Sequence, residues 1–187
     1  MAHASLYHGL REFQKRDIHR RRDSMFAELE ELTGGEARLL PGTEESQYPF
    51  WSPDSKKIAY NVEEGSRMDV YVIDLESRFI EQITDEASID AGPWWSADAR
   101  WFYFHSNREG EFSVWRVPGE GGEAVPFIRD RGARPSVSED GRFLFYAVGR
   151  NAPTVWSAGV DGGEAMPILE GAVWHWTLWT LWRDRLV

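Results

Sequence analysis

Acidic side chains are the residues of this chain that could most readily do chemistry. Three aspartates, Asp54, Asp98 and Asp140, follow one another at intervals of 44 and 42 residues. Two adjacent pairs, Glu44-Glu45 and Glu63-Glu64, have the residue type that glycosidases use as acid and base. Both pairs fall in segments that we predict to be loops, where carboxylates are solvated. They therefore do not predict a glycosidase.

Metal and thiol chemistry have little support in the sequence. The chain has no cysteine, which excludes disulfides, thiolate metal sites and cysteine nucleophiles. No histidine has a second ligand at the spacing of a zinc site. The five histidines are His3, His8, His19, His105 and His175. We expect no metal and no cofactor, and we interpret His105 as a satisfied residue of the core.

Nucleophilic and phosphate-transfer motifs are also missing from the sequence. No Gly-x-Ser-x-Gly nucleophile elbow occurs. The glycine-rich run Gly119–Gly122 lacks the Lys-Ser/Thr ending of a phosphate-binding loop. No catalytic residue is predicted, and the sequence favours a non-catalytic role.

The aspartates belong to a repeated motif, which predicts the elements around them. Trp51–Tyr60 reads WSPDSKKIAY, Trp95–Tyr103 reads WSADARWFY, and Val137–Tyr146 reads VSEDGRFLFY. A period of 42 to 44 residues fits one four-stranded blade of a β-propeller. Each aspartate is predicted to stabilise its own turn by accepting backbone N–H bonds.

A second motif keeps the same phase as the first. Gly-Gly-Glu-Ala occurs at Gly34, at Gly121-Gly122 and at Gly162-Gly163. Paired glycines accept the positive φ that a tight hairpin requires. The first full repeat has Leu75–Arg78 at this place instead. We therefore predict a structural turn motif made of Asp54, Asp98, Asp140, Gly121, Gly122, Gly162 and Gly163.

Each full repeat divides into four short apolar runs that we predict to be strands. The first repeat has Tyr48–Trp51, Lys57–Asn61, Asp69–Asp74 and Phe79–Thr84. The second has Gly92–Trp95, Trp101–Ser106, Ser113–Val117 and Glu123–Ile128. The third has Arg134–Val137, Phe143–Val148, Thr154–Ala158 and Glu164–Leu169. The predicted fold is an all-β propeller of about three complete blades, with partial blades at both ends and a short helical or irregular N-terminus.

The two ends of the chain need a separate interpretation. We predict residues 1–25 as a basic segment, helical or disordered, and residues 26–187 as the propeller domain. Phe26–Leu32 and Ala37–Leu40 could be the last two strands of a blade, although the former also fits a helical stripe. A fourth repeat starts near Val173 and breaks off. The repeats therefore predict a fragment of a larger ring with open sheet edges, or a four-bladed ring closed by both end pieces.

The repeats resemble a known family. The resemblance is carried by Pro49–Asp54, Ile58–Tyr60, Val70–Asp74 and His105–Gly110. These segments are similar to the TolB-type WD-repeat-like propeller repeat. Val114–Pro118 followed by Gly121 and Gly122 is also similar to bacterial propellers attached to winged-helix regulators, serine/threonine kinases or prolyl-oligopeptidase-type peptidases. The resemblance covers about residues 26–187 and implies a propeller that serves many architectures.

The charge of the chain limits the kinds of partner that it is expected to bind. The formal net charge is −10, although residues 1–23 carry six basic against three acidic residues. An acidic propeller repels nucleic-acid phosphates and attracts basic partners. No apolar run is long enough to span a membrane. If Met1 is the natural start, we expect a cytoplasmic protein, and a missing upstream signal would allow a periplasmic one.

The sequence thus predicts an interaction module that presents loops and a channel to a protein or peptide. The expected contributors are the loops around Glu63–Met68, Asn107–Glu111 and Gly149–Pro153. The aromatic run Val173–Trp182 is interpreted as a packed inner strand, with an aromatic platform or sticky edge as the alternative. Self-association through open edges is a further expectation. Two other hypotheses remain: a gating propeller of a prolyl-oligopeptidase-type peptidase, and a sensory propeller of a winged-helix regulator or kinase.

Overall fold

In a computed structural model of the chain, strands and connecting turns make up the described residues, with no helix among them. The described residues are 28–29, 38–43, 45–149, 153–170, 181–182 and 185–186. The prediction of an all-β fold with three four-stranded antiparallel blades is confirmed. The predicted basic segment 1–25 and most of the aromatic run, residues 173–180, lie outside the described residues.

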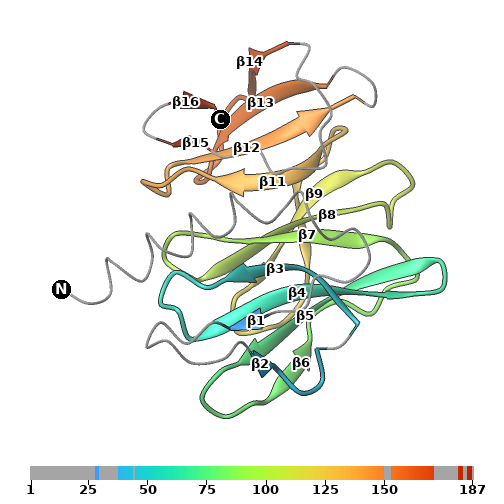
Figure 1. Cartoon of the computed structure of the whole chain (residues 1–187). Coiled ribbons are helices and arrows are strands. Elements are labelled where there is room, and N and C mark those ends of the chain that lie inside the picture. The colour runs from blue at the N-terminus through green and yellow to red at the C-terminus, as the bar shows by residue number, and fades with distance from the viewer. Residues whose placement is uncertain are drawn as a thin grey trace. The chain divides into compact units, whose positions relative to one another are not determined.

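Each full repeat forms one four-stranded antiparallel sheet whose strands follow their order in the sequence (Figure 1). The first sheet contains β3 (Ser46–Trp51), β4 (Lys57–Glu64), β5 (Arg67–Asp74) and β6 (Ile80–Gln82). The second contains β7 (Asp90–Trp95), β8 (Trp101–Ser106), β9 (Ser113–Pro118) and β10 (Val125–Ile128). The third contains β11 (Ala133–Val137), β12 (Phe143–Val148), β13 (Thr154–Gly159) and β14 (Met166–Leu169).

Two short hairpins lie outside these sheets. The chain divides into two compact units, residues 1–47 and 48–187. In the first unit, β1 (Glu28–Leu29) pairs antiparallel with β2 (Arg38–Leu39), as the interpretation of this region as strands predicts. In the second unit, β15 (Leu181–Trp182) pairs with β16 (Arg185–Leu186).

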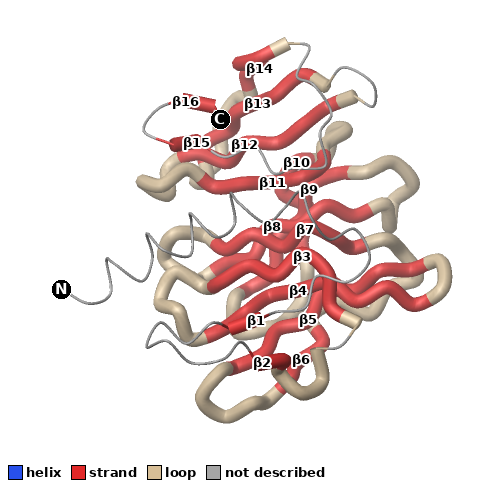
Figure 2. The backbone as a smooth tube through the Cα atoms, viewed as in Figure 1, coloured by secondary structure: helices blue, strands red, loops and turns tan. Residues whose placement is uncertain are grey.

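Because the strands run antiparallel and in order, the connections of each sheet divide between two ends (Figure 2). One end, the turn end, carries the turns after the first and third strands of each sheet. The other, the loop end, carries the connections after the second and fourth strands. The β4–β5 hairpin and the β8–β9 loop both lie at the loop end, on the right in Figures 1 and 2. The two repeated sequence motifs therefore lie at the opposite end from the predicted binding loops.

Apolar side chains fill the two spaces between neighbouring sheets. Successive residues of β8 point to opposite faces, so Phe102 and Phe104 join one cluster and Tyr103 joins another. The first cluster combines Phe50, Ala59, Val70 and Val72 with Trp95, Phe102, Phe104, Trp115 and Val117. The second combines Tyr103 and Val114 with Leu144, Tyr146 and Ala158. Burying one large apolar side chain contributes about 1.5–3 kcal/mol, so these clusters hold the three sheets together.

The first hairpin is longer than the sequence predicts. Glu63 and Glu64, predicted as loop residues, are the last residues of β4, and Glu64 pairs directly with Arg67 of β5. The turn between them is only two residues long, and Gly65 at its first position has a φ of +66°. The prediction of a loop here was wrong because this exposed half of the hairpin lacks the apolar alternation that marks a packed strand.

Candidate functional site

A serine and an aspartate two residues apart build the turn after the first strand of every sheet. In the β3–β4 turn, Ser52 Oγ donates to Asp54 Oδ1 at 2.6 Å, and the Lys56 N–H donates to the same oxygen at 3.1 Å. The Lys57 N–H donates to Ser52 Oγ at 2.9 Å, which closes the turn. The same bonds recur in the other sheets, at Ser96 and Asp98 and at Ser138 and Asp140.

These bonds also determine the charge of the aspartates. Hydrogen bonds from Ser96 and Arg100 lower the pKa of Asp98 to about 2. The pKa of Asp140 is lowered in the same way by Ser138 and by the Arg142 N–H. Both carboxylates are therefore ionised at neutral pH and already hold their donors, which does not suit a general acid. We propose that the repeated aspartates act in turn structure.

The glycine pairs form the turn after the third strand. Gly121 and Gly122 have φ values of +87° and +127°, and Gly162 and Gly163 have +100° and +119°. A β-carbon on Gly121 would lie 2.8 Å from Glu81 Oε1 of the neighbouring sheet, so a side chain there would force Glu81 to move. We propose that these glycines, too, serve the turns.

The first sheet builds the corresponding turn without glycines. Asp74 Oδ1 accepts hydrogen bonds from both the N–H and the hydroxyl of Ser77, each at 2.8 Å. Arg78 then takes the left-handed conformation, with a φ of +62°. An aspartate side chain thus supplies here the bonds that fix the turn.

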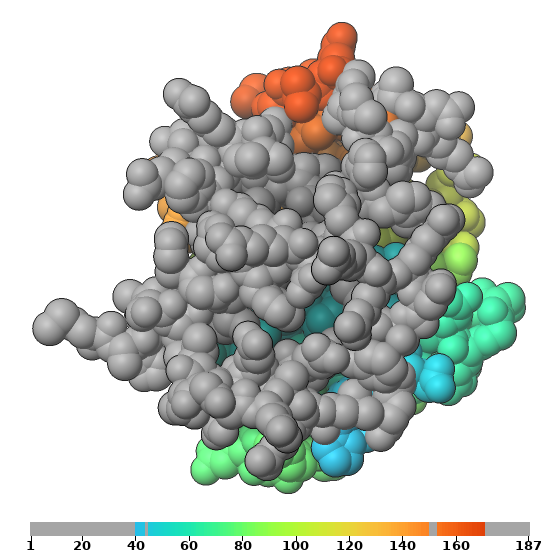
Figure 3. Space-filling model, in the orientation of Figure 1, coloured from blue at the N-terminus to red at the C-terminus, as the bar shows by residue number. Residues whose placement is uncertain are grey.

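Two of the three loops predicted to bind a partner lie at the loop end. The β4–β5 hairpin covers residues 63–68, and its turquoise atoms lie at the surface in Figure 3. Residues 107–112 form the connection between β8 and β9, and Glu109 and Glu111 within it are exposed. In the third predicted loop, residues 150–152 lie outside the described residues.

A buried asparagine joins the first and second sheets beneath these loops. Asn61, on β4, is completely buried. Its amide nitrogen donates to the carbonyl oxygens of Asp90 at 3.0 Å and Asp69 at 3.3 Å. Its amide oxygen accepts the Gly92 N–H at 3.1 Å. One side chain therefore fixes the first strand of the second sheet against the middle of the first sheet.

An ion pair fixes the β8–β9 loop to the same place. Arg108 Nη2 lies 2.6 Å from Asp90 Oδ2, and the Asp90 side chain is fully buried. Arg108 also donates to Ser106 Oγ at 3.0 Å, and its guanidinium carbon lies 4.7 Å from the ring centroid of Trp115. A buried pair of this kind is costly to break because one charge would be left uncompensated. The pair therefore holds the loop in one position.

Asp69 continues this charged network into the first hairpin. Its Oδ2 lies 3.3 Å from Arg67 Nε, and Arg67 also pairs with Glu64 at 3.0 Å. Burial raises the pKa of Asp69, and the charge of Arg67 only partly opposes that effect. The loop end thus combines a buried polar scaffold with exposed acidic tips.

His105 is a further polar residue held between sheets. The Arg134 N–H donates to His105 Nδ1 at 3.4 Å, and the ring contacts Phe112 edge-on at 5.3 Å. Burial lowers the pKa of His105 to about 4, and the nearby charge of Arg134 acts in the same direction. A β-carbon on Gly92 would lie 3.1 Å from the ring, so glycine makes room for the histidine. His105 is therefore neutral at physiological pH.

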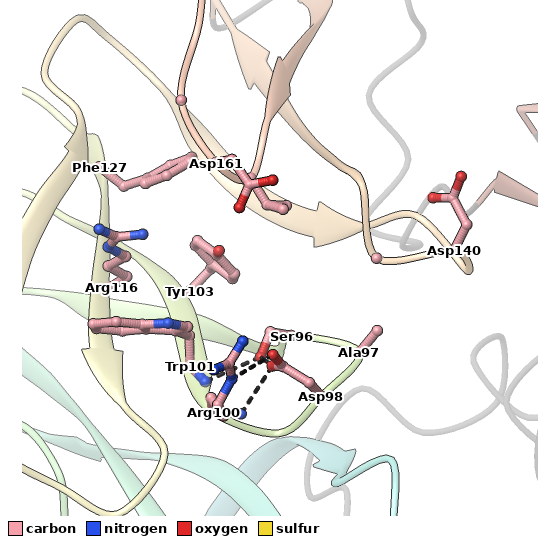
Figure 4. A pocket seen from close by; sticks show the side chains of 13 residues that line it. Ser96, Ala97, Asp98, Arg100, Trp101, Tyr103, Arg116, Phe127, Asp140 and Asp161 are labelled. Carbon is pink, nitrogen blue, oxygen red and sulfur yellow. Dashed lines mark hydrogen bonds and ion pairs between the residues drawn. The ribbon is translucent and has the colours of Figure 1, made fainter.

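A cavity that the sequence did not predict opens at the turn end. It has a volume of about 500 Å³ and lies between the second and third sheets (Figure 4). Its lining consists of Ser96, Ala97, Asp98, Arg100, Trp101, Tyr103, Arg116, Phe127, Asp140, Gly141, Val160, Asp161 and Gly162. Aromatic rings and charged groups therefore share one space.

Arg116 is the unusual member of that lining. Figure 4 shows its guanidinium between two rings, 4.4 Å from the ring centroid of Trp101 and 5.2 Å from that of Phe127. The strand registers place Val72 and Ser157 at the same position in the other sheets. Comparing the repeats position by position could have revealed this residue, because only the second repeat places a charge there.

Among the described residues, no group of three or more histidine or acidic side chains is arranged to hold a metal ion. The Glu63-Glu64 pair lies on one exposed hairpin strand, and successive strand residues point to opposite faces. These two carboxylates therefore do not face one another across a cavity, as a glycosidase pair does.

The arrangement of sheets and turns agrees with comparisons to known proteins. Residues 29–172 match the family model of the TolB beta propeller domain. The chain belongs to this family. This result confirms the resemblance recognised in the repeats, while the predicted boundary at residue 26 stays a prediction.

Two relatives in this comparison are much longer than the matched segment. An uncharacterized protein of Agrobacterium fabrum is 36% identical over 89 residues, which are 48% of this chain and 30% of that protein. The Tol-Pal system protein TolB of Alcanivorax borkumensis is 32% identical over 73 residues, which are 38% of this chain and 17% of that protein. The matches thus cover less than a third of either relative.

Solved structures show the same fold. A TolB-type protein from Agrobacterium tumefaciens is 27% identical, with a TM-score of 0.67 over 74% of this chain and 54% of that chain. TolB from Acinetobacter baumannii is 22% identical, with a TM-score of 0.64 over 75% and 36%. A prolyl endopeptidase is 17% identical, with a TM-score of 0.60 over 81% and 27%. The last two likenesses concern the fold alone.

Proposed function

We propose that this TolB-type propeller domain is a non-catalytic binding module that presents its loop end to a protein or peptide partner. The observation that carries the proposal is the buried network of Asn61, Asp90 and Arg108. It fixes the β8–β9 loop to β7, and it fixes β7 to β4 at the base of the β4–β5 hairpin. Loops held rigidly lose little conformational freedom on binding, which favours affinity.

The charge of the loop end indicates the kind of partner. Glu63, Glu64, Glu109 and Glu111 are exposed there. Three arginines near them are already paired, since Arg67 pairs with Glu64, Arg108 pairs with buried Asp90, and exposed Arg131 lies 3.8 Å from Glu111. Because the whole chain carries a net charge of −10, a basic segment of a partner is attracted and nucleic acid is repelled.

The location of the protein is also a proposal. Similarity to a Tol-Pal system protein favours the periplasmic alternative, and nothing in the comparisons supports the cytoplasmic expectation. Fractionation of the source cells, with a marker protein for each compartment, tests this point. Recovery of the chain with the cytoplasmic marker alone would refute the periplasmic proposal.

Affinity capture with matched variants tests the binding function. The native domain is compared with Glu109→Lys, which reverses a charge at the loop end, and with Glu76→Lys, which makes the same change in the exposed β5–β6 turn. We expect one or more proteins from the source organism to be retained by the native domain and by Glu76→Lys, and to be lost with Glu109→Lys. Equal retention by both variants would place binding elsewhere and refute the proposal.

A peptidase role is tested separately. The purified chain is incubated with proline-containing peptides and the products are analysed by mass spectrometry. We expect no cleavage, because the chain has no Gly-x-Ser-x-Gly nucleophile elbow. Cleavage that survives further purification would make the chain an enzyme and contradict the proposal.

A further inference from the structure

The turn-end cavity contains a guanidinium that no carboxylate of the described residues pairs with. Arg116 lines this cavity on the side of the second sheet. Its Nε is buried and has no hydrogen-bond partner. No carboxylate in the described part of the chain lies within 4 Å of its guanidinium. A partly buried charge in this state is costly, which points to an anionic group that is absent from the free protein.

The rings around Arg116 fix its direction without neutralising it. The rings of Trp101 and Phe127 lie on two sides of the guanidinium (Figure 4), an arrangement that attracts the cation without cancelling its charge. Tyr103 lies beside it as a neutral hydrogen-bond partner, and burial raises the pKa of Tyr103 although the charge and the hydrogen bond of Arg116 oppose that shift. The Tyr103 hydroxyl is therefore protonated at neutral pH. The wall on this side thus offers a planar cation and aromatic surface.

The opposite wall carries the complementary charge. Asp161 lies in the β13–β14 turn, and Figure 4 shows its carboxylate directed into the space facing Tyr103 and Arg116. No basic group in the described ranges forms an ion pair with it. The other acids are already occupied, because Asp98 binds Arg100 at 2.6 Å and Asp140 binds Ser138 at 2.6 Å. Within the described residues, the cavity therefore has one charge of each sign that lacks an ion-pair partner, and the two lie on facing walls.

We propose that this cavity binds a short peptide segment through the carboxylate of an acidic side chain, which pairs with Arg116. Asp161 accepts hydrogen bonds from N–H groups of the same segment, and the rings of Trp101 and Phe127 contact its apolar parts. Phosphate is a poorer ligand, because three aspartates line the same space and repel a doubly charged anion more strongly than a single carboxylate. The site is separate from the loop end and does not depend on the function proposed for that end.

Titration with blocked tripeptides tests this site. The probes are acetyl-Phe-Glu-Phe-amide, the same peptide with Gln or Lys at the centre, and inorganic phosphate. Binding is followed by the indole N–H signal of Trp101 in nuclear magnetic resonance spectra of the whole chain. We expect the Glu peptide to shift this signal in a saturable way, and the Gln peptide to bind about tenfold more weakly, since a charged hydrogen bond becomes a neutral one.

Three variants separate the contributions of the charges. Arg116→Val should abolish binding of the Glu peptide, and it should fold because Val72 occupies the same position in the first sheet. Arg100→Ala removes an equal charge from the same cavity but one that Asp98 already neutralises, so it should keep at least about half of the affinity. Asp161→Asn should weaken the Glu peptide by a few-fold at most, because an amide oxygen still accepts hydrogen bonds.

Several results would overturn the proposal. The first is that the Lys peptide binds more tightly than the Glu peptide and that Asp161→Asn loses this binding. The second is that the Glu peptide binds equally well to the native protein and to Arg116→Val. The third is that phosphate displaces the Glu peptide at equal concentration. Because every readout concerns the Trp101 signal at the turn end, a negative result leaves the loop-end capture experiment to be judged on its own.

Discussion

Three residues at one position of the repeated turn adopt the left-handed conformation, and only one of them is glycine. The φ values are +61° at Ser55, +59° at Ala99 and +71° at Gly141. A non-glycine residue in this region costs about 1–2 kcal/mol, and glycine recovers part of this after its own entropy cost. We therefore predict that Ser55→Gly stabilises the protein by about 0.5–1 kcal/mol, measured by urea unfolding.

The opposite substitution is the control for that prediction. Gly141→Ala introduces a β-carbon 2.8 Å from the β-carbon of Ala97, in addition to the strained φ. It should destabilise the protein by about 1–2 kcal/mol. Unfolding midpoints that move in the same direction for both variants would contradict this account of the turn.

His105 makes stability depend on pH. Burial lowers its pKa from 6.5 to about 4, so between these values the unfolded chain binds a proton that the native chain does not. The stabilisation is complete above pH 6.5 and is lost as the pH falls toward 4, by at most about 3 kcal/mol. Urea unfolding at pH 7.5, 6 and 5 should show this decline.

His105→Gln separates this effect from that of the carboxylates. Glutamine cannot take up a proton in this range, while the titrating acids stay the same. The variant should be less stable than the native protein at pH 7.5, and the difference should shrink at pH 5. A constant difference between the two proteins across the series would show that His105 is not the titrating group.

Asn61 connects the first two sheets, and we expect its replacement to destabilise the protein more than the loss of any other connection between elements described above. Replacing it with alanine removes the bonds that its side chain makes to the Gly92 N–H and to the Asp90 carbonyl, both of which lie between the sheets. Each unsatisfied buried group costs about 1–3 kcal/mol, so Asn61→Ala should destabilise by about 2–4 kcal/mol. Glu64→Ala, which removes only an exposed ion pair near the hairpin tip, should cost less than about 1 kcal/mol. Similar unfolding midpoints for the two variants would refute this role of Asn61.

The sequence predicted the strands best where they are packed on both faces. The bounds of β8 and β12 agree with the predicted runs Trp101–Ser106 and Phe143–Val148, because apolar residues fill both faces there. The end of β4 was missed at Glu63 and Glu64, since exposed hairpin residues have no hydrophobic pattern. Strand prediction therefore fails where the sheet extends into solvent.

The site was predictable only in part, for a related reason. The turn aspartates and glycines could be identified because their bonds are local, although the serine partner Ser52 was not foreseen. The cavity could not be identified, because Tyr103 and Asp161 meet only when two sheets stack. Of the residues that line the cavity, Arg116 could have been singled out from the sequence, because it is charged where the other repeats have Val72 and Ser157.

At the scale of the whole molecule, the two ends of the sheets have different chemistry. The loop end combines a buried polar scaffold with exposed acidic tips, and the turn end combines repeated polar turns with one cavity. The family match covers most of the chain, and similar propellers occur in proteins of different activity. Function therefore depends on the particular residues at each end, and at the loop end we propose that they bind a partner.

Site-specific photo-crosslinking in the source organism tests whether the loop end binds a partner. A benzophenone amino acid is placed at Glu109 in the β8–β9 loop, and in a second protein at Glu76 in the β5–β6 turn. We predict a discrete crosslinked protein adduct from position 109 and none from position 76, because only the former lies at the loop end. Adducts from position 76 alone, or none from position 109, would contradict the account.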